Sequence, residues 1–180
     1  QRKPRTMILL ALVASAFMFA PLVGWAERRA APFLAVIPLT LFAAFCLLWP
    51  GVAAGEALVE VHRWIPSLGV SASFRLDGLS LTFGLLITGI GGIVFLYASA
   101  YLHRTRRLAR FYTVLTLFMA SMLGAVLADD LVMLVVFWEL TSLTSFLLIG
   151  YSPEEAESRR SAQQGFLVTV AGGLAMLAGV

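Results

Sequence analysis

Six apolar stretches, each long enough to cross a lipid bilayer, divide this 180-residue chain. A helix of about 20 residues spans a hydrocarbon core of ~30 Å at ~1.5 Å per residue. Water does not reach the backbone in that core, so apolar runs of this length adopt helices there. The expected spans are residues 7–25, 31–49 (closed by Pro50-Gly51), 79–102, 111–128, 131–151 and a stretch from about 162 to 180. The fold class predicted is therefore an all-α integral membrane protein.

Composition agrees with a multi-pass location in the cell membrane. Hydrophobic residues make up 60% of the chain and charged residues only 13%, about half the ~25% typical of soluble domains. The formal net charge is +3, but the basic residues are scattered among loops rather than gathered on one aromatic-laced face. We therefore expect lipid, and no nucleic acid, as a partner.

The residue types that build cofactor, metal or catalytic sites are sparse. Cys46 is the single cysteine, and His62 and His103 are far apart in the sequence. The sequence has no G-x-x-x-x-G-K-[ST] phosphate loop and no set of nucleophile and base. We expect no metal, no cofactor, no enzymatic activity and no direct use of ATP.

The basic residues also predict the orientation in the membrane, because cytoplasmic loops are enriched in Lys and Arg. One side holds Arg2, Lys3, Arg5, Arg63 and Arg75, and the other holds Arg28, Arg29, Arg104, Arg106, Arg107, Arg110, Arg159 and Arg160. The second side should be cytoplasmic, which places the N-terminus outside. A signal peptide is the alternative for the first stretch, although no clean A-x-A cleavage site follows it.

The predicted helices define five parts of the chain. They are 1–49 with the first two transmembrane helices, 50–78 as an extracytoplasmic loop, 79–128 with helices three and four, 129–151 with helix five, and 152–180 with a connector and the start of helix six. Within the loop, Val70 to Asp77 alternates apolar with polar or small residues, which favours a strand in a β-hairpin. Asp77 is well placed to cap the third helix.

Small residues recur at every fourth position on two of the helices. The third has Ser80, Gly84, Thr88 and Gly92, and the sixth has Gly165, Thr169 and Gly173. Such stripes let helices approach closely in lipid, so we expect both to be packing surfaces.

Glu139 is a carboxyl group inside the fifth apolar stretch, about 12 Å from its start at Leu131 and so near mid-membrane. A charge at that depth costs at least about 2.5–3.5 kcal/mol, and such residues usually mark a proton or ion path. The alternative is a buried ion pair that only joins two helices. We interpret Glu139 as a proton-transfer residue.

Hydroxyl groups surround Glu139 in the sequence. Ser142 and Ser145 lie on the same side of the helix, and Thr141 and Thr144 add to its polarity. They can support a proton path by bonding a carboxyl group or water, but bonding back to helix carbonyls is slightly favoured. Before them, Asp129 and Asp130 are predicted to cap the fifth helix.

Several segments together resemble one family, the antiporter-like subunits shared by Mrp-type cation/proton antiporters and respiratory complex I. They are 64–69 (WIPSLG), 75–81 (RLDGLSL), 87–91 (ITGIG), 97–99 (YAS), 128–131 (ADDL), 137–143 (FWELTSL) and 145–151 (SFLLIGY). The FWELTS segment, followed by 172–179 (GGLAMLAG), is most similar to the A subunit of Mrp sodium/proton antiporters. The resemblance is weak before Trp64.

The resemblance implies a bundle of fourteen core helices, of which this chain would supply the N-terminal six. It also implies a hetero-oligomeric complex that couples proton influx to sodium export. The family's glutamate on the fifth helix matches Glu139, and its partner lysines lie on later helices. Lys3 is the single lysine and is not within a span, so the chain looks like part of a longer protein. Two alternatives remain: a proton-translocating subunit of a complex I-like oxidoreductase, and a non-transporting assembly subunit.

Overall fold

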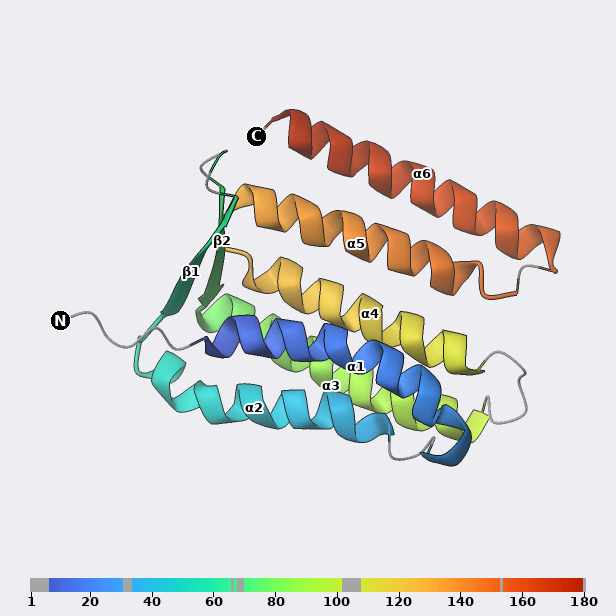
Figure 1. Cartoon of the computed structure of the whole chain (residues 1–180), viewed down its shortest axis with the longest axis horizontal. Coiled ribbons are helices and arrows are strands. Elements are labelled where there is room, and N and C mark those ends of the chain that lie inside the picture. Colours follow the sequence, from blue (N-terminus) through green and yellow to red (C-terminus); the bar gives the residue numbers. More distant parts are fainter. Residues whose placement is uncertain are drawn as a thin grey trace.

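The computed structural model describes residues 7–30, 34–65, 67, 70–101, 108–152 and 154–179, with the side chains of 24–30 left undescribed. In these ranges the elements are α1 (Ile8–Ala30), α2 (Val36–Ala53), β1 (Leu58–Ile65), β2 (Val70–Leu76), α3 (Gly78–Tyr101), α4 (Leu108–Leu127), α5 (Leu131–Ile149) and α6 (Ala156–Ala178). Figure 1 shows the helices side by side, with the hairpin at one end of the bundle.

Helix α4 is the centre of the bundle. It packs against α1, α3 and α5, while α2 packs on α3 and α6 packs on α5. Half of the α4 span (50%) is buried, against 11% of the α6 span. Helix α6 therefore forms an edge of the described bundle, where it covers one face of α5.

Five helices, α2 to α6, are long and apolar enough to cross a membrane. The described apolar part of α1, Ile8–Val23, is shorter than a full span. Helix α2 runs past its expected end at Trp49 to Ala53, through Pro50. Proline is tolerated here because its missing N–H affects one bond in the last turn, and the Ala54 N–H still donates to the Pro50 carbonyl.

The predicted strand is confirmed, and its partner is β1. The two strands pair antiparallel, with Leu58 opposite Leu76 and Val61 opposite Ser73. Beyond Leu127 the chain returns to the hairpin, where the Asp129 N–H donates to the Ser73 carbonyl at 2.9 Å. The hairpin is therefore bound to the α4–α5 junction.

Acidic side chains join the hairpin to two helices. Glu60 of β1 is buried, and its two carboxylate oxygens accept the Leu9 and Leu10 N–H groups at the start of α1, at 3.0 and 3.1 Å. Asp130 caps α5 by accepting the Met133 N–H at 2.8 Å, as predicted, and it also accepts from Ser73.

Asp77 caps α3, as the sequence predicted. Its Oδ1 accepts the backbone N–H groups of Leu79 and Ser80, each at 3.0 Å. The hydrogen bond from the Ser80 N–H is the main reason that the pKa of Asp77 is lowered. Nearby, Asp129 pairs with Arg75 rather than capping α5, and its hydrogen bond and charge raise the pKa of Arg75.

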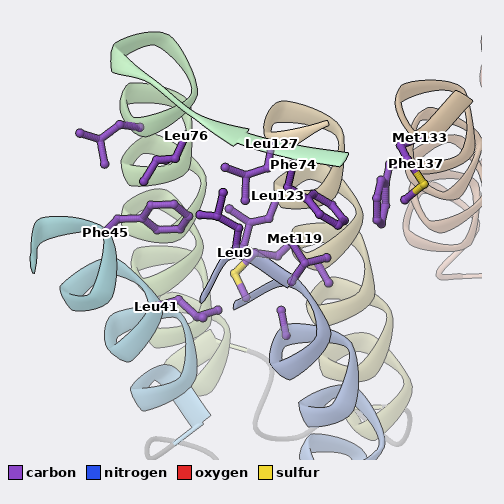
Figure 2. Packing of buried hydrophobic residues seen from close by; sticks show 14 residues of the cluster. Leu9, Leu41, Phe45, Phe74, Leu76, Met119, Leu123, Leu127, Met133 and Phe137 are labelled. Atoms are coloured by element: carbon purple, nitrogen blue, oxygen red, sulfur yellow. The ribbon is translucent and has the colours of Figure 1, made fainter. Parts of the chain in front are cut away.

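The main apolar core lies beneath the hairpin (Figure 2). Phe74 and Leu76 point from β2 into the bundle and are almost fully buried. There they meet Leu9 of α1, Phe45 of α2, and Leu123 and Leu127 of α4. The hairpin thus closes one end of the core instead of lying free as a loop.

The small-residue stripe on α3 is a packing surface, as predicted, and its partner is α2. A Cβ on Gly84 would lie 2.8 Å from the Phe45 ring, and one on Gly92 would lie 3.0 Å from Leu39. Thr88 is fully buried between them and donates to the Gly84 carbonyl.

Candidate functional site

Glu139 lies on α5, eight residues after the helix begins at Leu131. Glu139 therefore lies about 12 Å along the helix from Leu131, and its depth in the membrane stays a prediction. The Oε1 atom of Glu139 is buried and has no hydrogen-bond partner among the described residues. Such a group is uncommon, because a buried polar atom without a partner costs about 1–3 kcal/mol.

Phe137 fixes the direction in which Glu139 points. Its ring packs against α4 so closely that a Cβ on Gly124 would overlap it. The ring also contacts Phe17 and Phe74, with centroid distances of 6.2 and 6.1 Å. Residues two positions apart lie about 200° apart around a helix. Seating Phe137 on α4 therefore turns Glu139 to the opposite face, toward α6.

Gly173 of α6 stands directly opposite the carboxyl group. A Cβ built on Gly173 would overlap Glu139 Oε1 and would lie 3.3 Å from Trp138 Cδ1. Gly173 is itself buried. The carboxyl group therefore occupies space that exists because residue 173 has no side chain.

The neighbouring hydroxyls donate to carbonyls of their own helix. Thr141 and Ser142 both donate to the Trp138 carbonyl, at 2.6 and 3.1 Å, and Ser145 donates to the Ser142 carbonyl at 2.9 Å. Thr144 donates to the Leu140 carbonyl at 2.7 Å. These hydroxyl oxygens keep lone pairs for another donor, such as water. Their support of a proton path stays a prediction.

Glu139 has no ion-pair partner in the part of the chain that the structure describes. At the hairpin, Arg75 forms an ion pair with Asp129, and Glu60 lies 3.6 Å from the His62 ring nitrogen Nε2. The same ranges hold no cluster of three His, Cys, Asp or Glu side chains that could bind a metal ion. His103, Lys3 and the basic connector 104–107 fall outside the described residues.

Sequence reasoning missed two contacts. It assigned Gly173 to a packing stripe without its neighbour, because the rotation of α6 about its axis is set by tertiary packing. It gave no role to Glu60, whose partners lie about 50 positions earlier in the chain. No local signal could have found this contact, because Glu60 alternates with Val59 and Val61, and those two valines are the exposed residues.

Two protein families match the chain. Residues 64–112 match the family described as complex I NADH-ubiquinone oxidoreductase, chain 5 N-terminus. Residues 128–180, which include Glu139 and Gly173, match the NADH:quinone oxidoreductase/Mrp antiporter transmembrane family.

Curated relatives agree with these matches. The chain is 45% identical over 147 residues to the Na⁺/H⁺ antiporter A1 subunit of Staphylococcus haemolyticus, covering 82% of this chain and 18% of the relative. It is 48% identical over 148 residues to the Na⁺/H⁺ antiporter A subunit of Alkalihalophilus pseudofirmus, with the same coverage. The chain thus spans about a fifth of these relatives' length.

The structure is similar to the Mrp complex of Dietzia sp. DQ12-45-1b, with a TM-score of 0.82, 37% identity, and coverage of 94% of this chain and 18% of that one. The fold also matches a membrane-bound sulfane sulfur reductase, an archaeal respiratory membrane complex, with a TM-score of 0.75 and 19% identity over 96% of this chain and 35% of that chain.

Proposed function

Because the chain belongs to the antiporter-like subunit family, with relatives named as A subunits of sodium/proton antiporters, we propose that it works in a multisubunit cation/proton antiporter. Its site is Glu139, which transfers protons across the middle of the membrane. The transported cation is sodium or another monovalent ion, and the other subunits of the complex are its partners.

The observation that carries this proposal is the buried Oε1 of Glu139 without a donor. In a lipid-spanning helix a carboxylate without a partner is costly. A cationic side chain or a water file that reaches the carboxyl favours the ionised state. If such a partner approaches and leaves the carboxyl group in turn, the group can take up a proton from one side of the membrane and release it to the other side.

The proposal includes a wider architecture. The chain forms the N-terminal six of fourteen core helices, with the β1–β2 hairpin on the extracytoplasmic side. The cationic partner of Glu139 lies on a later helix. The gap in the hydrogen bonding of Glu139 and the small buried fraction of α6 support this arrangement, because both leave groups for further helices to contact.

A redox-linked proton pump is the second candidate, since the descriptions of both matching families also name quinone oxidoreductases. The similarity of the curated relatives to sodium/proton antiporters favours exchange instead. A third possibility, an assembly role in which Glu139 only joins helices, makes a different prediction for the same variants.

The experiment measures sodium-driven proton flux in vesicles that contain the full complex, normalised to assembled complex. Glu139→Gln keeps the size of the side chain but removes the titrating proton, so flux should be abolished while assembly stays normal. Glu139→Asp should retain partial flux. Glu155→Gln, an exposed glutamate at the start of α6 without a capping bond, is the matched control and should be silent.

Full flux in Glu139→Gln at normal assembly excludes Glu139 from the proton path. Loss of assembly instead supports the structural ion pair, because an unpaired buried cation costs about 3–5 kcal/mol.

A further inference from the structure

We infer that Gly173 is a positioning residue for Glu139: its missing side chain creates the space in which the carboxyl group is held between α5 and α6. The inference rests on the proposed function of Glu139 but concerns a different residue on a different helix. It assigns to Gly173 a role in proton transfer, beyond the packing expected of a small-residue stripe.

The carboxyl group of Glu139 is in very close contact with Gly173. Oε1 of Glu139 lies where a Cβ of residue 173 would have to be, and Cδ of Glu139 would be 2.9 Å from that Cβ. Real Cβ atoms do not approach other heavy atoms so closely. A single methyl group at position 173 therefore displaces the carboxyl group or pushes α6 away from α5.

The backbone of α5 is held in place, so Glu139 can make room for a methyl group only by changing the conformation of its flexible side chain, which moves the carboxyl group. Phe137 fixes the rotation of α5 by filling the space over Gly124 of α4. Trp138 stands next to Gly173 and would itself be 3.3 Å from the added Cβ. Gly124 of α4 and Gly173 of α6 thus lie against opposite faces of α5. Gly124 contacts Phe137, and Gly173 contacts Glu139.

The Oε1 atom of Glu139 is buried and has no donor among the described residues, while the residue as a whole is half-buried. The close approach of α6 at Gly173 therefore covers one oxygen of the carboxyl group. A carboxyl displaced from this space would gain access to water or to other donors. Proton transfer depends on this placement, because a shift of about 1 Å in a reacting group can cost up to ~100-fold in rate.

Gly172 offers a matched control beside Gly173. A Cβ on Gly172 meets no atom within 4 Å. Gly172→Ala and Gly173→Ala therefore change helix propensity equally, in favour of the helix, and within this chain they differ in the contacts that residue 173 makes with Glu139 and Trp138.

The test uses the full antiporter complex carrying each change. Gly173→Ala should lower coupled exchange by roughly tenfold or more and alter its pH profile, while Gly172→Ala should leave both unchanged. A second readout does not depend on transport: the rate at which dicyclohexylcarbodiimide, an apolar reagent for carboxyl groups, labels Glu139. The labelling rate should change in Gly173→Ala, because the carboxyl group leaves its position against residue 173, and should stay unchanged in Gly172→Ala.

A combined variant separates positioning from packing. Asp is one methylene shorter than Glu, so Glu139→Asp should make room for the methyl group of Gly173→Ala. The double variant should then assemble and exchange as well as Glu139→Asp alone. If it is worse by the full factor of the single Gly173→Ala change, the contact is not with the carboxyl group and the inference is wrong.

Equal exchange and equal labelling in Gly173→Ala and Gly172→Ala would also overturn the inference. The two failures are distinguishable. Normal exchange in Glu139→Gln defeats the proposed function, whereas unchanged labelling in Gly173→Ala defeats the positioning role whatever the transport assay shows.

Discussion

Removing the carboxylate of Glu60 should destabilise the first turn of α1. Glu60→Ala deletes two hydrogen bonds, from the Leu9 and Leu10 N–H groups, at 3.0 and 3.1 Å. Hydrogen bonds to a charged group contribute about 1.5–3 kcal/mol each, and loss of a helix cap costs about 0.5–2 kcal/mol. The Leu9 hydrogen bond is buried, but the Leu10 hydrogen bond is only partly buried, so water can replace part of this loss and we expect a local loss of about 2–4 kcal/mol.

Hydrogen exchange of the peptide that begins α1 measures this loss directly. With a factor of ten for each ~1.4 kcal/mol, the Leu9 and Leu10 amides should exchange roughly 30- to 1,000-fold faster in Glu60→Ala. Glu56→Ala changes an exposed carboxylate just before the same strand and is the control. Glu60→Gln keeps one acceptor oxygen but loses the charge and replaces the second acceptor by an NH2 donor, so its effect should be intermediate. If Glu60→Ala exchanges like Glu56→Ala, the carboxylate does not hold the helix end.

Three further predictions concern packing, pH and orientation. Gly84→Leu should reduce the yield and thermal stability of the complex, because the added side chain meets the Phe45 ring, 2.8 Å from the first added carbon; normal values would mean that α2 yields without loss of stability. The lowered pKa of Asp77 means that its cap stabilises α3 above the ordinary aspartate pKa and loses this effect as pH falls through the lowered value. Asp77→Asn should remove that acid-dependent part of the melting temperature, and an unchanged pH dependence would contradict it. Cysteines placed singly at Ser67 and Thr105 should react with an impermeant reagent from outside and from inside the cell, respectively, and the reverse pattern would invert the topology.

Local signals in the sequence predicted the parts of the fold that depend on neighbouring residues. The apolar runs predicted the helices, the alternation before Asp77 predicted β2, and Asp77 itself predicted a cap that the structure confirms. Glu139 stood out because its polarity conflicts with the segment around it. In each case the interactions that determine the local structure involve residues only a few positions apart in the chain.

The contacts that sequence could not supply join distant elements. The rotation of α5 is decided by Phe137 seating against α4, and no pattern within α5 reports it. Gly173 had a visible period of four, yet which atom it faces depends on how α6 lies on α5. Pro50 was expected to end the second helix, but α2 continues to Ala53. The loss of one backbone N–H donor at Pro50 costs less than the hydrogen bonds of one more helical turn contribute.

The hairpin also has a mechanical consequence for the site. Through Ser73 and Asp130 it fastens the first turn of α5, at the end of the helix that precedes Glu139. Helix α5 is therefore anchored at its hairpin end, and a tilt of the helix would rotate it about that end. Glu139 sits about 12 Å along it. A tilt of only about 5° at the hairpin end carries the carboxyl group through about 1 Å, enough to make or break a hydrogen bond across to a neighbouring helix.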